Sequence, residues 1–147
     1  MDHSPTHNSL KVEEDLSQYF KPFSILVIGD LILDEYLHGE VSRLVFDRPI
    51  PVLSSKASIR QLGGAANLLN NISSICSLAS LAVVGTVGDD DSGRHLRNLL
   101  DDRGIATGGV LVVPGRPTTH KLRVVAQDQH YLLRLDRERT DDPSAIS

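Results

Sequence analysis

The sequence predicts an α/β protein in which a mainly parallel sheet is flanked by helices and accompanied by a small separate pair of strands. Three short apolar runs, typical of buried strands, occupy residues 23–28, 81–84 and 110–113. Two segments with helical periodicity separate these runs, at residues 65–75 and 92–103. Aromatic residues make up only 4% of the chain and apolar residues 40%, so the core must come mainly from Leu, Val, Ile and Ala.

The length of 147 residues suits one ordinary domain. We expect residues 1–22 to form a flexible extension that could contain a short helix at 10–20, ended by Pro22. Residues 140–147 are polar and are expected to form a frayed tail. The domain itself therefore covers residues 23–139.

The first strand is predicted at residues 23–28, where the apolar run FSILVI is closed by Gly29 and Asp30. A run without polar alternation is typical of a strand that is buried on both faces of a parallel sheet. We therefore expect neighbours on both faces of this strand.

A different pattern follows, because residues 34–55 contain glycine and prolines and show no helical periodicity. They predict a separate pair of strands at residues 36–41 and 50–53. Pro49 and Pro51 disfavour a central place in a sheet, since proline cannot donate a ladder hydrogen bond. We expect an edge structure or a flap.

The next helix is predicted over residues 65–75, directly after Gly63 and Gly64. Its apolar residues are expected to face the sheet; they are Ala65, Leu68, Leu69, Ile72 and Ile75. Two glycines before a helix allow a ligand to approach the free N–H groups of its first turn, and Asn67 adds a donor and an acceptor. This arrangement suits a hydroxyl-rich ligand such as a sugar, and an ordinary tight turn is the alternative.

Strand, helix and strand then follow once more. The apolar run 81–84 ends in Gly85, and the helix at 92–103 is expected to place three leucines inward, with Gly104 at its C-cap. These leucines are Leu96, Leu99 and Leu100. Residues 110–113 complete the alternation that is typical of an α/β fold.

Beyond Pro117 the pattern changes to the two-residue alternation of an exposed strand. Lys121 and Arg123 fall on one face with Thr119, while apolar residues dominate the other face. Residues 131–135 can return after a turn at 127–129. We therefore predict a hairpin with one polar, basic face.

Composition excludes several classes of protein. A formal net charge of -4 argues against general nucleic-acid binding, which needs a basic surface. The single Cys76 excludes an internal disulfide bond, and no metal-ligand spacing surrounds it. The N-terminus lacks the apolar segment of a secretory signal, and the best apolar run, residues 78–84, is too short to cross a bilayer. We expect a cytoplasmic protein without nucleic-acid or membrane partners.

Asp34 follows the first strand closely, so it could stand at the carboxyl edge of the sheet, where open α/β proteins bind ligands. A carboxylate can accept hydrogen bonds from two neighbouring sugar hydroxyls. An aspartate in a solvated loop is the alternative.

Together these features resemble the ribokinase (PfkB) family of carbohydrate kinases. The motifs that carry the resemblance are Gly29-Asp30 with Asp34, the run GGAAN at 63–67, and VGTVGDD at 84–90. Within the family the chain is most similar to kinases of D-glycero-D-manno-heptose 7-phosphate, through GDLILDEYLHG, SRLVFDRPIPVL, GGAANLLNNI and PTTHKLRVVAQDQHYLLRLD. Such kinases stand alone or are fused to an enzyme that forms ADP-heptose. The resemblance runs from about residue 23 to 136 and implies a ribokinase-like fold.

The resemblance also implies a set of acceptor-binding residues. Asp34 matches the aspartate that binds sugar hydroxyls, Gly63 and Gly64 match the glycine pair of the sugar pocket, and Asn67 matches the asparagine that contacts the sugar. Residues 36–53 resemble part of the β-lid, which covers the sugar and often forms a homodimer. Lys121 and Arg123 are candidates for binding the phosphate of a sugar phosphate. A solvated or ion-paired strand face is the alternative for these two.

The resemblance implies a reaction that needs more than this sequence. Family members transfer the γ-phosphoryl group of ATP with Mg²⁺, and their catalytic base lies in a Gly-Ala-Gly-Asp segment that is absent here up to Ser147. We therefore expect an incomplete kinase domain that binds the acceptor, has no catalytic or metal-binding residue, binds no ATP alone, and could be completed by a separate C-terminal half. The alternative is a non-catalytic remnant that binds sugar or dimerises. A Rossmann-type nucleotide-binding protein is disfavoured, because no Gly-x-Gly-x-x-Gly follows the first strand.

Overall fold

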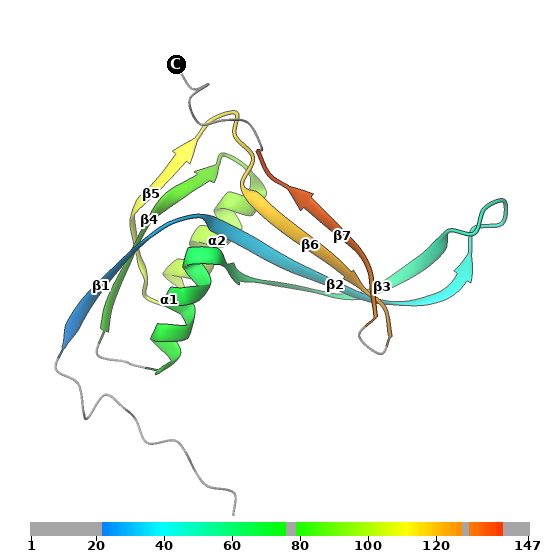
Figure 1. Cartoon of the computed structure of the whole chain (residues 1–147), viewed down its shortest axis with the longest axis horizontal. Coiled ribbons are helices and arrows are strands. Elements are labelled where there is room, and N and C mark those ends of the chain that lie inside the picture. Colours follow the sequence, from blue (N-terminus) through cyan, green and yellow to red (C-terminus); the bar gives the residue numbers. More distant parts are fainter. Residues whose placement is uncertain (1–21, 76–78, 128–129, 140–147) are drawn as a thin grey trace, which may run out of the picture.

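A computed structural model describes residues 22–75, 79–127 and 130–139, which form two sheets and two helices (Figure 1). Almost all of the predicted N-terminal extension, the predicted tail and Cys76 lie outside these residues. The fold is α/β with a parallel sheet, as predicted.

The first sheet, sheet A, contains the three predicted strands. They are β1 (Phe23–Ile28), β4 (Ala79–Gly88) and β5 (Ala106–Val113), in the order β1-β4-β5. Both pairings are parallel, and β4 and β5 are longer than their apolar runs predicted. Parallel pairing follows because each connection passes through a helix that returns the chain to the same end of the sheet.

The helices are α1 (Gly64–Ile75) and α2 (Asp91–Asp101). Both lie between the strands of sheet A and the second sheet (Figure 1). They close a core whose buried apolar residues are Leu31, Leu33, Leu62, Ala66, Leu69, Leu81, Val83, Val87, Leu96, Leu100 and Ile105. Helix α2 ends earlier than predicted: its C-cap is Asp102, and Gly104 follows it at φ 66°.

The predicted inward face of α1 is wrong at two positions. Leu69 is fully buried, but Leu68 and Ile75 are more than half exposed. At about 100° per residue the buried stripe is centred between Ala66 and Leu69, which leaves Leu68 and Ile75 on one flank. Ala66 therefore takes the inward place that the pattern gave to the larger Leu68.

The prediction that β1 is buried on both faces is also wrong. Ile25 and Val27 pack against the core, whereas Leu26 is 58% exposed and Ile28 73% exposed. Both helices contribute to the same core as the inner residues of β4, so they cover the same face of the sheet. In the part of the chain that the structure describes, the other face of sheet A lies open.

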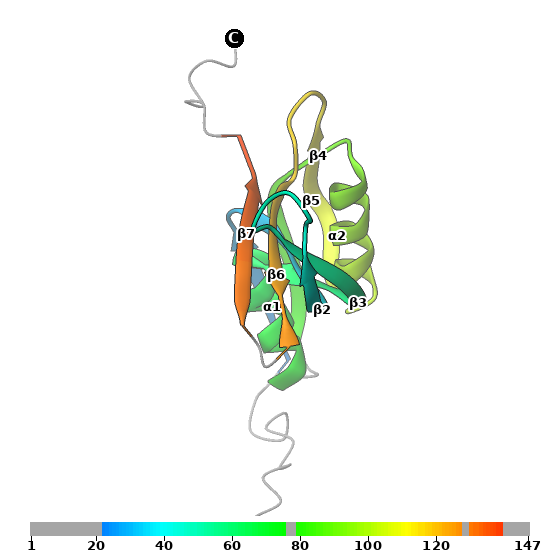
Figure 2. The same cartoon turned by 90° about the vertical axis from the view of Figure 1, so that its right-hand side faces the viewer.

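The second sheet, sheet B, joins segments that are distant in sequence. It consists of β2 (Leu31–Leu44), β3 (Pro51–Gly63), β6 (Thr119–Val125) and β7 (Tyr131–Arg137), in the order β3-β2-β6-β7. The predicted hairpin is present as the antiparallel pair β6 and β7, and β3 is an edge strand, as Pro49 and Pro51 predicted. In Figure 2, β7 and α2 lie on opposite sides of the molecule.

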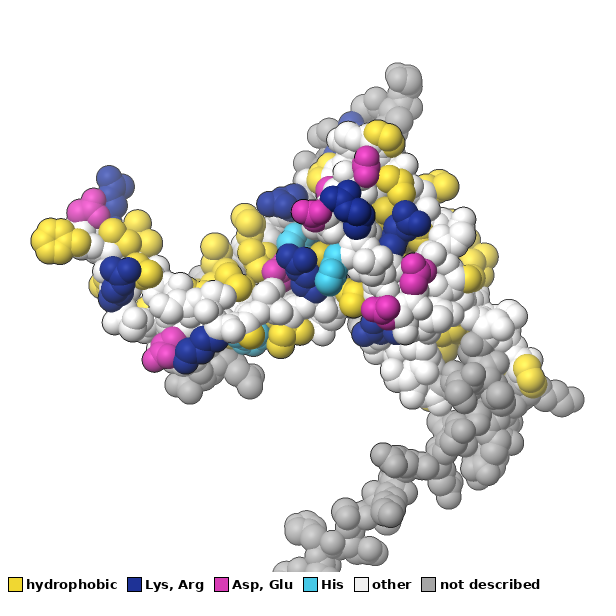
Figure 3. Space-filling view, turned by 180° about the vertical axis from the view of Figure 1, so that it is seen from behind, with side chains coloured by type: hydrophobic (Ala, Val, Ile, Leu, Met, Phe, Trp, Pro, Cys, Tyr) yellow, Lys and Arg dark blue, Asp and Glu magenta, His cyan; other side chains and the backbone are white. Residues whose placement is uncertain are grey.

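Two features of sheet B depart from the prediction. Strands β2 and β3 are much longer than residues 36–41 and 50–53, and β2 pairs in parallel with β6, so the predicted flap and hairpin are one sheet. The far ends of β2 and β3 form an arm that leaves the body (Figures 1 and 3). Its tip, residues 44–50, carries exposed apolar side chains.

Candidate acceptor site

The glycine pair stands where the chain passes from β3 into α1. Gly64 has φ 56°, a conformation that side chains rarely adopt, and a Cβ on it would collide with the carbonyl oxygen of Asp30. The Ala65 amide donates a hydrogen bond to that same oxygen at 3.0 Å. Gly64 is therefore required for the turn that starts α1 against the junction of β1 and β2.

Gly63 serves a different purpose, because it lies beside Asp34. A Cβ at Gly63 would collide with Asp34 Oδ2, so only glycine leaves room for this carboxylate. Asp34 lies on β2 and Gly63 ends β3, where it pairs with Ile32. The sequence prediction named both residues, and the structure brings them together.

The strand register arranges side chains in two rows across one face of sheet B. One row crosses the strands through Gln61, Asp34, Lys121 and Asp136. The next row crosses them through Ile59, Tyr36, Arg123 and Arg134. Because residues two apart on a strand share a face, these two rows form one surface, which we call the acceptor face.

Arg123 is held by two contacts on the acceptor face. Its Nη1 donates to Asp34 Oδ1, and its guanidinium lies 5.1 Å from the centre of the Tyr36 ring. The pair is only partly accessible, since the Arg123 and Asp34 side chains are 20% and 18% exposed. The hydrogen bond to Asp34 raises the pKa of Arg123, while Arg134 opposes that shift.

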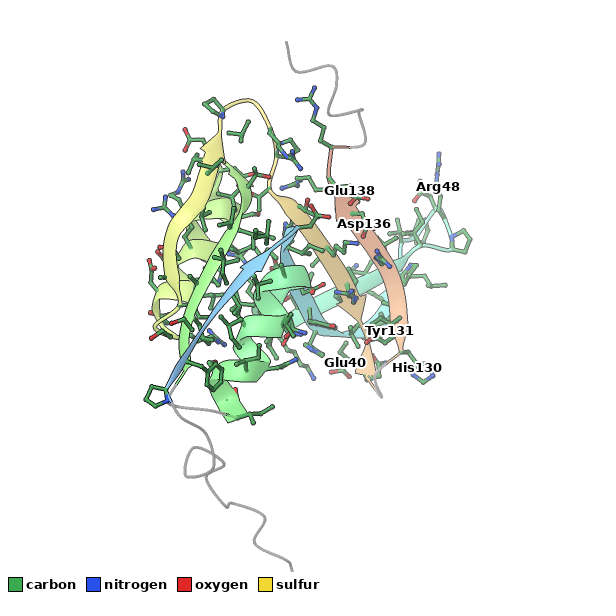
Figure 4. All side chains as sticks on the ribbon, turned by 60° about the vertical axis from the view of Figure 1, so that its left-hand side comes forward. Glu40, Arg48, His130, Tyr131, Asp136 and Glu138 are labelled. Atoms are coloured by element: carbon green, nitrogen blue, oxygen red, sulfur yellow. The ribbon has the colours of Figure 1, made fainter. Side chains whose placement is uncertain are left out.

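Arg134 and Asp136 form a second pair on the same face. Arg134 donates from Nε to Asp136 Oδ1 at 2.8 Å and from Nη2 to Oδ2 at 2.7 Å. This pair is more exposed, with the Arg134 side chain 52% accessible. Asp136 lies near one end of β7 and Tyr131 near the other (Figure 4). Lys121 lies between Asp34 and Asp136 in register.

The opposite face of sheet B anchors the strands that carry Asp34 and Arg123. Glu35 is buried and accepts hydrogen bonds from Ser58 Oγ at 2.6 Å and Arg60 Nε at 3.1 Å. Burial alone would raise the pKa of Glu35, but these hydrogen bonds and the charges of Arg60 and His120 lower it. His120 Nε2 lies 2.9 Å from Glu35 Oε2 without hydrogen-bond geometry, and its Nδ1 lies 3.4 Å from Ser92 Oγ on α2.

A separate network fixes the start of β6. Asp90 caps α2 by accepting from the Gly93 amide at 2.8 Å, and it accepts from the Thr118 hydroxyl at 2.7 Å and the Thr118 amide at 2.9 Å. Thr118 Oγ1 in turn accepts from the Gly88 amide at 2.8 Å. The VGDD motif thus positions the strand that carries Lys121 and Arg123.

The predicted site residues do not all contact one another. Asn67 is exposed on the first turn of α1 and, within the described residues, forms no hydrogen bond with Asp34. The prediction missed Tyr36, Arg134 and Asp136 as neighbours of Arg123. The two-residue spacing of Arg134 and Asp136 signalled a shared face, but only the register of β6 with β7 places that face beside Arg123.

Two features are absent from the part of the chain that the structure describes. Over residues 22–75, 79–127 and 130–139, no three or more His, Cys, Asp or Glu side chains form a group that could hold a metal ion. No helix in these ranges is long and apolar enough to span a membrane.

The family is decided by a match to residues 22–145, which fit the description "pfkB family carbohydrate kinase". The chain belongs to the pfkB family of carbohydrate kinases. This confirms the resemblance drawn from the glycine pair and the VGDD motif.

Curated relatives share much of this sequence. The chain is 47% identical over 121 residues to "Bifunctional protein HldE" of Helicobacter pylori strain J99, covering 82% of the chain and 26% of that protein. It is 40% identical over 126 residues to the protein of the same name in Rhodopseudomonas palustris strain BisA53, covering 85% of the chain and 25% of the relative. The chain therefore spans about a quarter of the length of these relatives.

Solved structures show the same fold. Ribokinase of Cryptococcus neoformans, crystallised in complex with ADP, superposes with a TM-score of 0.55 at 23% identity, over 80% of this chain and 34% of that one. Ribokinase of Arabidopsis thaliana, complexed with ribose and ATP, gives a TM-score of 0.56 at 22% identity, over 80% of this chain and 36% of that one. The fold is ribokinase-like.

Proposed function

We propose that this chain carries the acceptor-binding half of an ATP-dependent carbohydrate kinase that acts in the cytoplasm on heptose 7-phosphate. The observation that carries the proposal is the partly buried carboxylate of Asp34, for which Gly63 leaves room and beside which Arg123 lies. The similarity to the heptose 7-phosphate kinases supports the choice of acceptor.

Each predicted site residue has a role in this proposal. Asp34 accepts hydrogen bonds from sugar hydroxyls, and Lys121 and Arg123 bind the sugar phosphate. Gly63 and Gly64 let the sugar approach the backbone at the start of α1, where Asn67 adds an amide. ATP with Mg²⁺ supplies the phosphoryl group in such kinases. We assign no residue of this chain to either.

The open face of sheet A supports a further part of the proposal, namely that a C-terminal half completes the kinase. Leu26, Ile28 and Leu111 are exposed there, although parallel sheets are ordinarily covered on both faces. The ribokinases that superpose on this chain are about three times as long as the matched part. A helical layer from that half would cover the exposed residues.

We also propose that a second copy of the chain binds at the tip of the arm, through the predicted β-lid. Leu44 and Ile50 are more than half exposed there, and Phe46 is fully exposed. Figure 3 shows hydrophobic side chains at the tip of the arm. A contiguous exposed apolar patch on a projecting element is typical of an interaction site. Light scattering should show a dimer that Phe46→Ser abolishes, and a monomer at all concentrations of the unmodified chain would refute the proposal.

The test of the proposed function is calorimetric titration of the 147-residue chain with heptose 7-phosphate. Asp34→Asn should weaken binding by about 1.5 to 3 kcal/mol, the usual contribution of a hydrogen bond to a charged group. Asp102→Asn, an exposed change at the C-cap of α2, is the matched control and should bind normally. Unchanged binding by Asp34→Asn would remove Asp34 from the site.

A second candidate function is a non-catalytic module that binds sugar or dimerises. The exposed tip of the arm favours it, because dimerisation through the tip needs no nucleotide. Adding a C-terminal half from an HldE relative separates the two candidates, since only the first gains phosphorylation of heptose 7-phosphate in a coupled assay.

A further inference from the structure

The root of the arm has fewer strand neighbours than the rest of sheet B. Within the described residues, the pairing of β2 with β6 ends at His38, and residues 39–44 of β2 pair with β3 alone. The arm is therefore a two-stranded ribbon, and such ribbons are at best marginally stable in water. The direction in which the arm leaves the body must then depend on contacts at its root.

The pairing of β2 with β3 is also irregular at this root. The register shifts between His38 and Gly39, and it shifts again between Val41 and Arg43. An irregularity of this kind disrupts the ladder of hydrogen bonds and bends the strand locally. The ladder between β2 and β3 is therefore weakened on both sides of Val41.

The side chain of Gln127 binds the arm between these two irregularities. Its Oε1 accepts a hydrogen bond from the Val41 amide at 2.9 Å, and its Nε2 donates one to the Val41 carbonyl oxygen at 3.2 Å. One side-chain amide thus satisfies both backbone groups of Val41, as a neighbouring parallel strand would. Gln127 continues the contact of β2 with the body beyond the point where β6 ends.

The turn that carries Gln127 gives this contact a fixed base. The turn joins β6 to β7 and lies at the root of the arm (Figure 1). It is closed by a hydrogen bond from the Ala126 amide to the His130 carbonyl oxygen at 2.8 Å. Gln127 therefore connects the arm to the end of a paired hairpin.

We propose that Gln127 is a clamp that fixes the direction of the arm and so prepares its tip to bind a second copy of the chain. The inference rests on the proposed dimer and adds the residue that positions its contact surface. Gln127 is a positioning residue, because it acts through Val41 and is not part of the tip at residues 44–50.

The effect on dimerisation follows from conformational entropy. The exposed apolar residues Leu44, Phe46 and Ile50 all lie beyond Val41 along the arm. An arm that swings about its root must lose that freedom when the tip binds, whereas an arm that is already fixed loses little. The clamp therefore strengthens the dimer without adding a contact to it.

The first experiment measures the dimer by sedimentation equilibrium of the full 147-residue chain. Gln127→Ala removes both hydrogen bonds and should raise the dimer dissociation constant about tenfold. Gln127→Glu can still accept from the Val41 amide but cannot donate to its carbonyl oxygen, so it should fall between the two. Circular dichroism reports whether each variant folds, and Gln127→Glu decides the question if Gln127→Ala does not.

The matched control is Lys56→Ala, a change on the same arm. It breaks the Lys56–Glu40 ion pair, whose side chains are 67% and 50% exposed, and leaves Val41 untouched. Exposed ion pairs contribute little, so the dimer dissociation constant should stay the same. An equal loss of affinity in Lys56→Ala and Gln127→Ala would overturn the clamp.

A second measurement detects the clamp without the dimer. In the Phe46→Ser background, the added change Gln127→Ala should make the Val41 amide exchange with solvent at least about fivefold faster by nuclear magnetic resonance, and leave the Leu33 amide unchanged. A merely structural role for Gln127 would speed both amides by the same factor. Equal acceleration of both, or no change at Val41, refutes the clamp.

The outcomes distinguish the clamp from the dimer on which it rests. If the unmodified chain and Gln127→Ala form a dimer with the same dissociation constant, the clamp is refuted and the dimer stands. If the unmodified chain stays monomeric, the proposed dimer fails and the inference fails with it. Neither result bears on acceptor binding, which the sugar titration tests by itself.

Discussion

Sheet A and sheet B differ in how their side chains are partnered. Sheet A packs one face against both helices and leaves apolar residues such as Leu26 and Ile28 exposed on the other. Sheet B pairs charges on both of its faces, with Arg123 beside Asp34 on one and Arg60 beside Glu35 on the other. The first sheet is apolar and half covered, and the second is charged and internally paired.

This difference shows what each sheet can do. Ion pairs on sheet B can exchange partners with a polar ligand, because hydrogen bonds broken to the protein are replaced by hydrogen bonds to the ligand. The exposed residues of sheet A have no polar partner to exchange, and only another apolar surface can cover them favourably. Under the proposed function, sheet B binds the acceptor and, through the tip of its arm, a second copy, whereas the open face of sheet A binds the C-terminal half.

The strongest test of this division concerns catalysis. The 147-residue chain alone should show no phosphorylation of heptose 7-phosphate in a coupled assay. We expect the catalytic base and the nucleotide site to lie in the C-terminal half. Loss of a base typically costs a factor of about 10² to 10⁴, and loss of a nucleotide site also removes the rate gain from positioning the reactants. If the highly purified chain is active and Asp34→Ala abolishes that activity, the prediction that the catalytic residues lie in the C-terminal half is wrong.

The next largest effect is a loss of folding stability, expected when the core against the covered face of sheet A is changed. Leu100 on α2 is fully buried in the core, so Leu100→Ala should lower the free energy of unfolding by about 2 to 5 kcal/mol in urea titrations. Ile28→Ala, on the open face, is the matched control and should change it by less than about 0.5 kcal/mol. Equal losses at both positions would mean that the open face is packed in solution.

The sequence predicted the strands and helices better than it predicted which strands lie side by side. Period and composition predicted all three strands of sheet A and both helices, because those signals are local. The pairing of β2 with β6 was not predicted, since it joins Asp34 to Arg123 across 89 positions of sequence. The alternation of polar and apolar residues indicates which residues share a face of a strand, but it does not indicate which other strand lies beside that strand. Arg134 and Asp136 were missed for the same reason.

The error on β1 has a different cause. Its apolar side chains do point in both directions, as the run at 23–28 indicated, but helices meet only the direction of Ile25 and Val27. A sequence pattern reports which surfaces are apolar and not which of them is covered. The open face could be identified only from the positions of α1 and α2.

A smaller effect is expected where sheet B is joined to α2. Burial alone would raise the pKa of Asp90, but hydrogen bonds from Thr118 and Gly93 lower it below its ordinary value. The stability that Asp90 contributes is therefore present above pH ~4 and is lost as the pH falls through the lowered pKa. Asp90→Asn should reduce the unfolding free energy by about 0.5 to 2 kcal/mol near neutral pH and flatten its acid dependence.

The measurement is urea unfolding of the unmodified chain and of the Asp90→Asn variant, from pH 7 down to the lowest pH at which each still folds. Asp91→Asn is the control, because Asp91 is exposed and its ion-pair partner among the described residues is the exposed Arg94. Its unfolding free energy should match that of the unmodified chain within about 0.5 kcal/mol. An Asp90→Asn variant with the full acid dependence would assign that dependence to other carboxylates, Glu35 first among them.

The smallest effect on stability, and the sharpest contrast between the sheets, is expected for serine at Leu26 and Ile28 together. Exposed side chains contribute little to folding, so the unfolding free energy should change by less than about 0.5 kcal/mol. Self-association should fall nevertheless, because copies would associate through the exposed apolar face of sheet A, which includes its edge strand β1. Phe46→Ser removes association at the arm and provides the comparison.

Light scattering across a concentration series should show that the double serine variant keeps the dimer but loses larger species, whereas Phe46→Ser loses the dimer. Larger species that persist in the double variant would mean that association uses a surface other than the open face of sheet A.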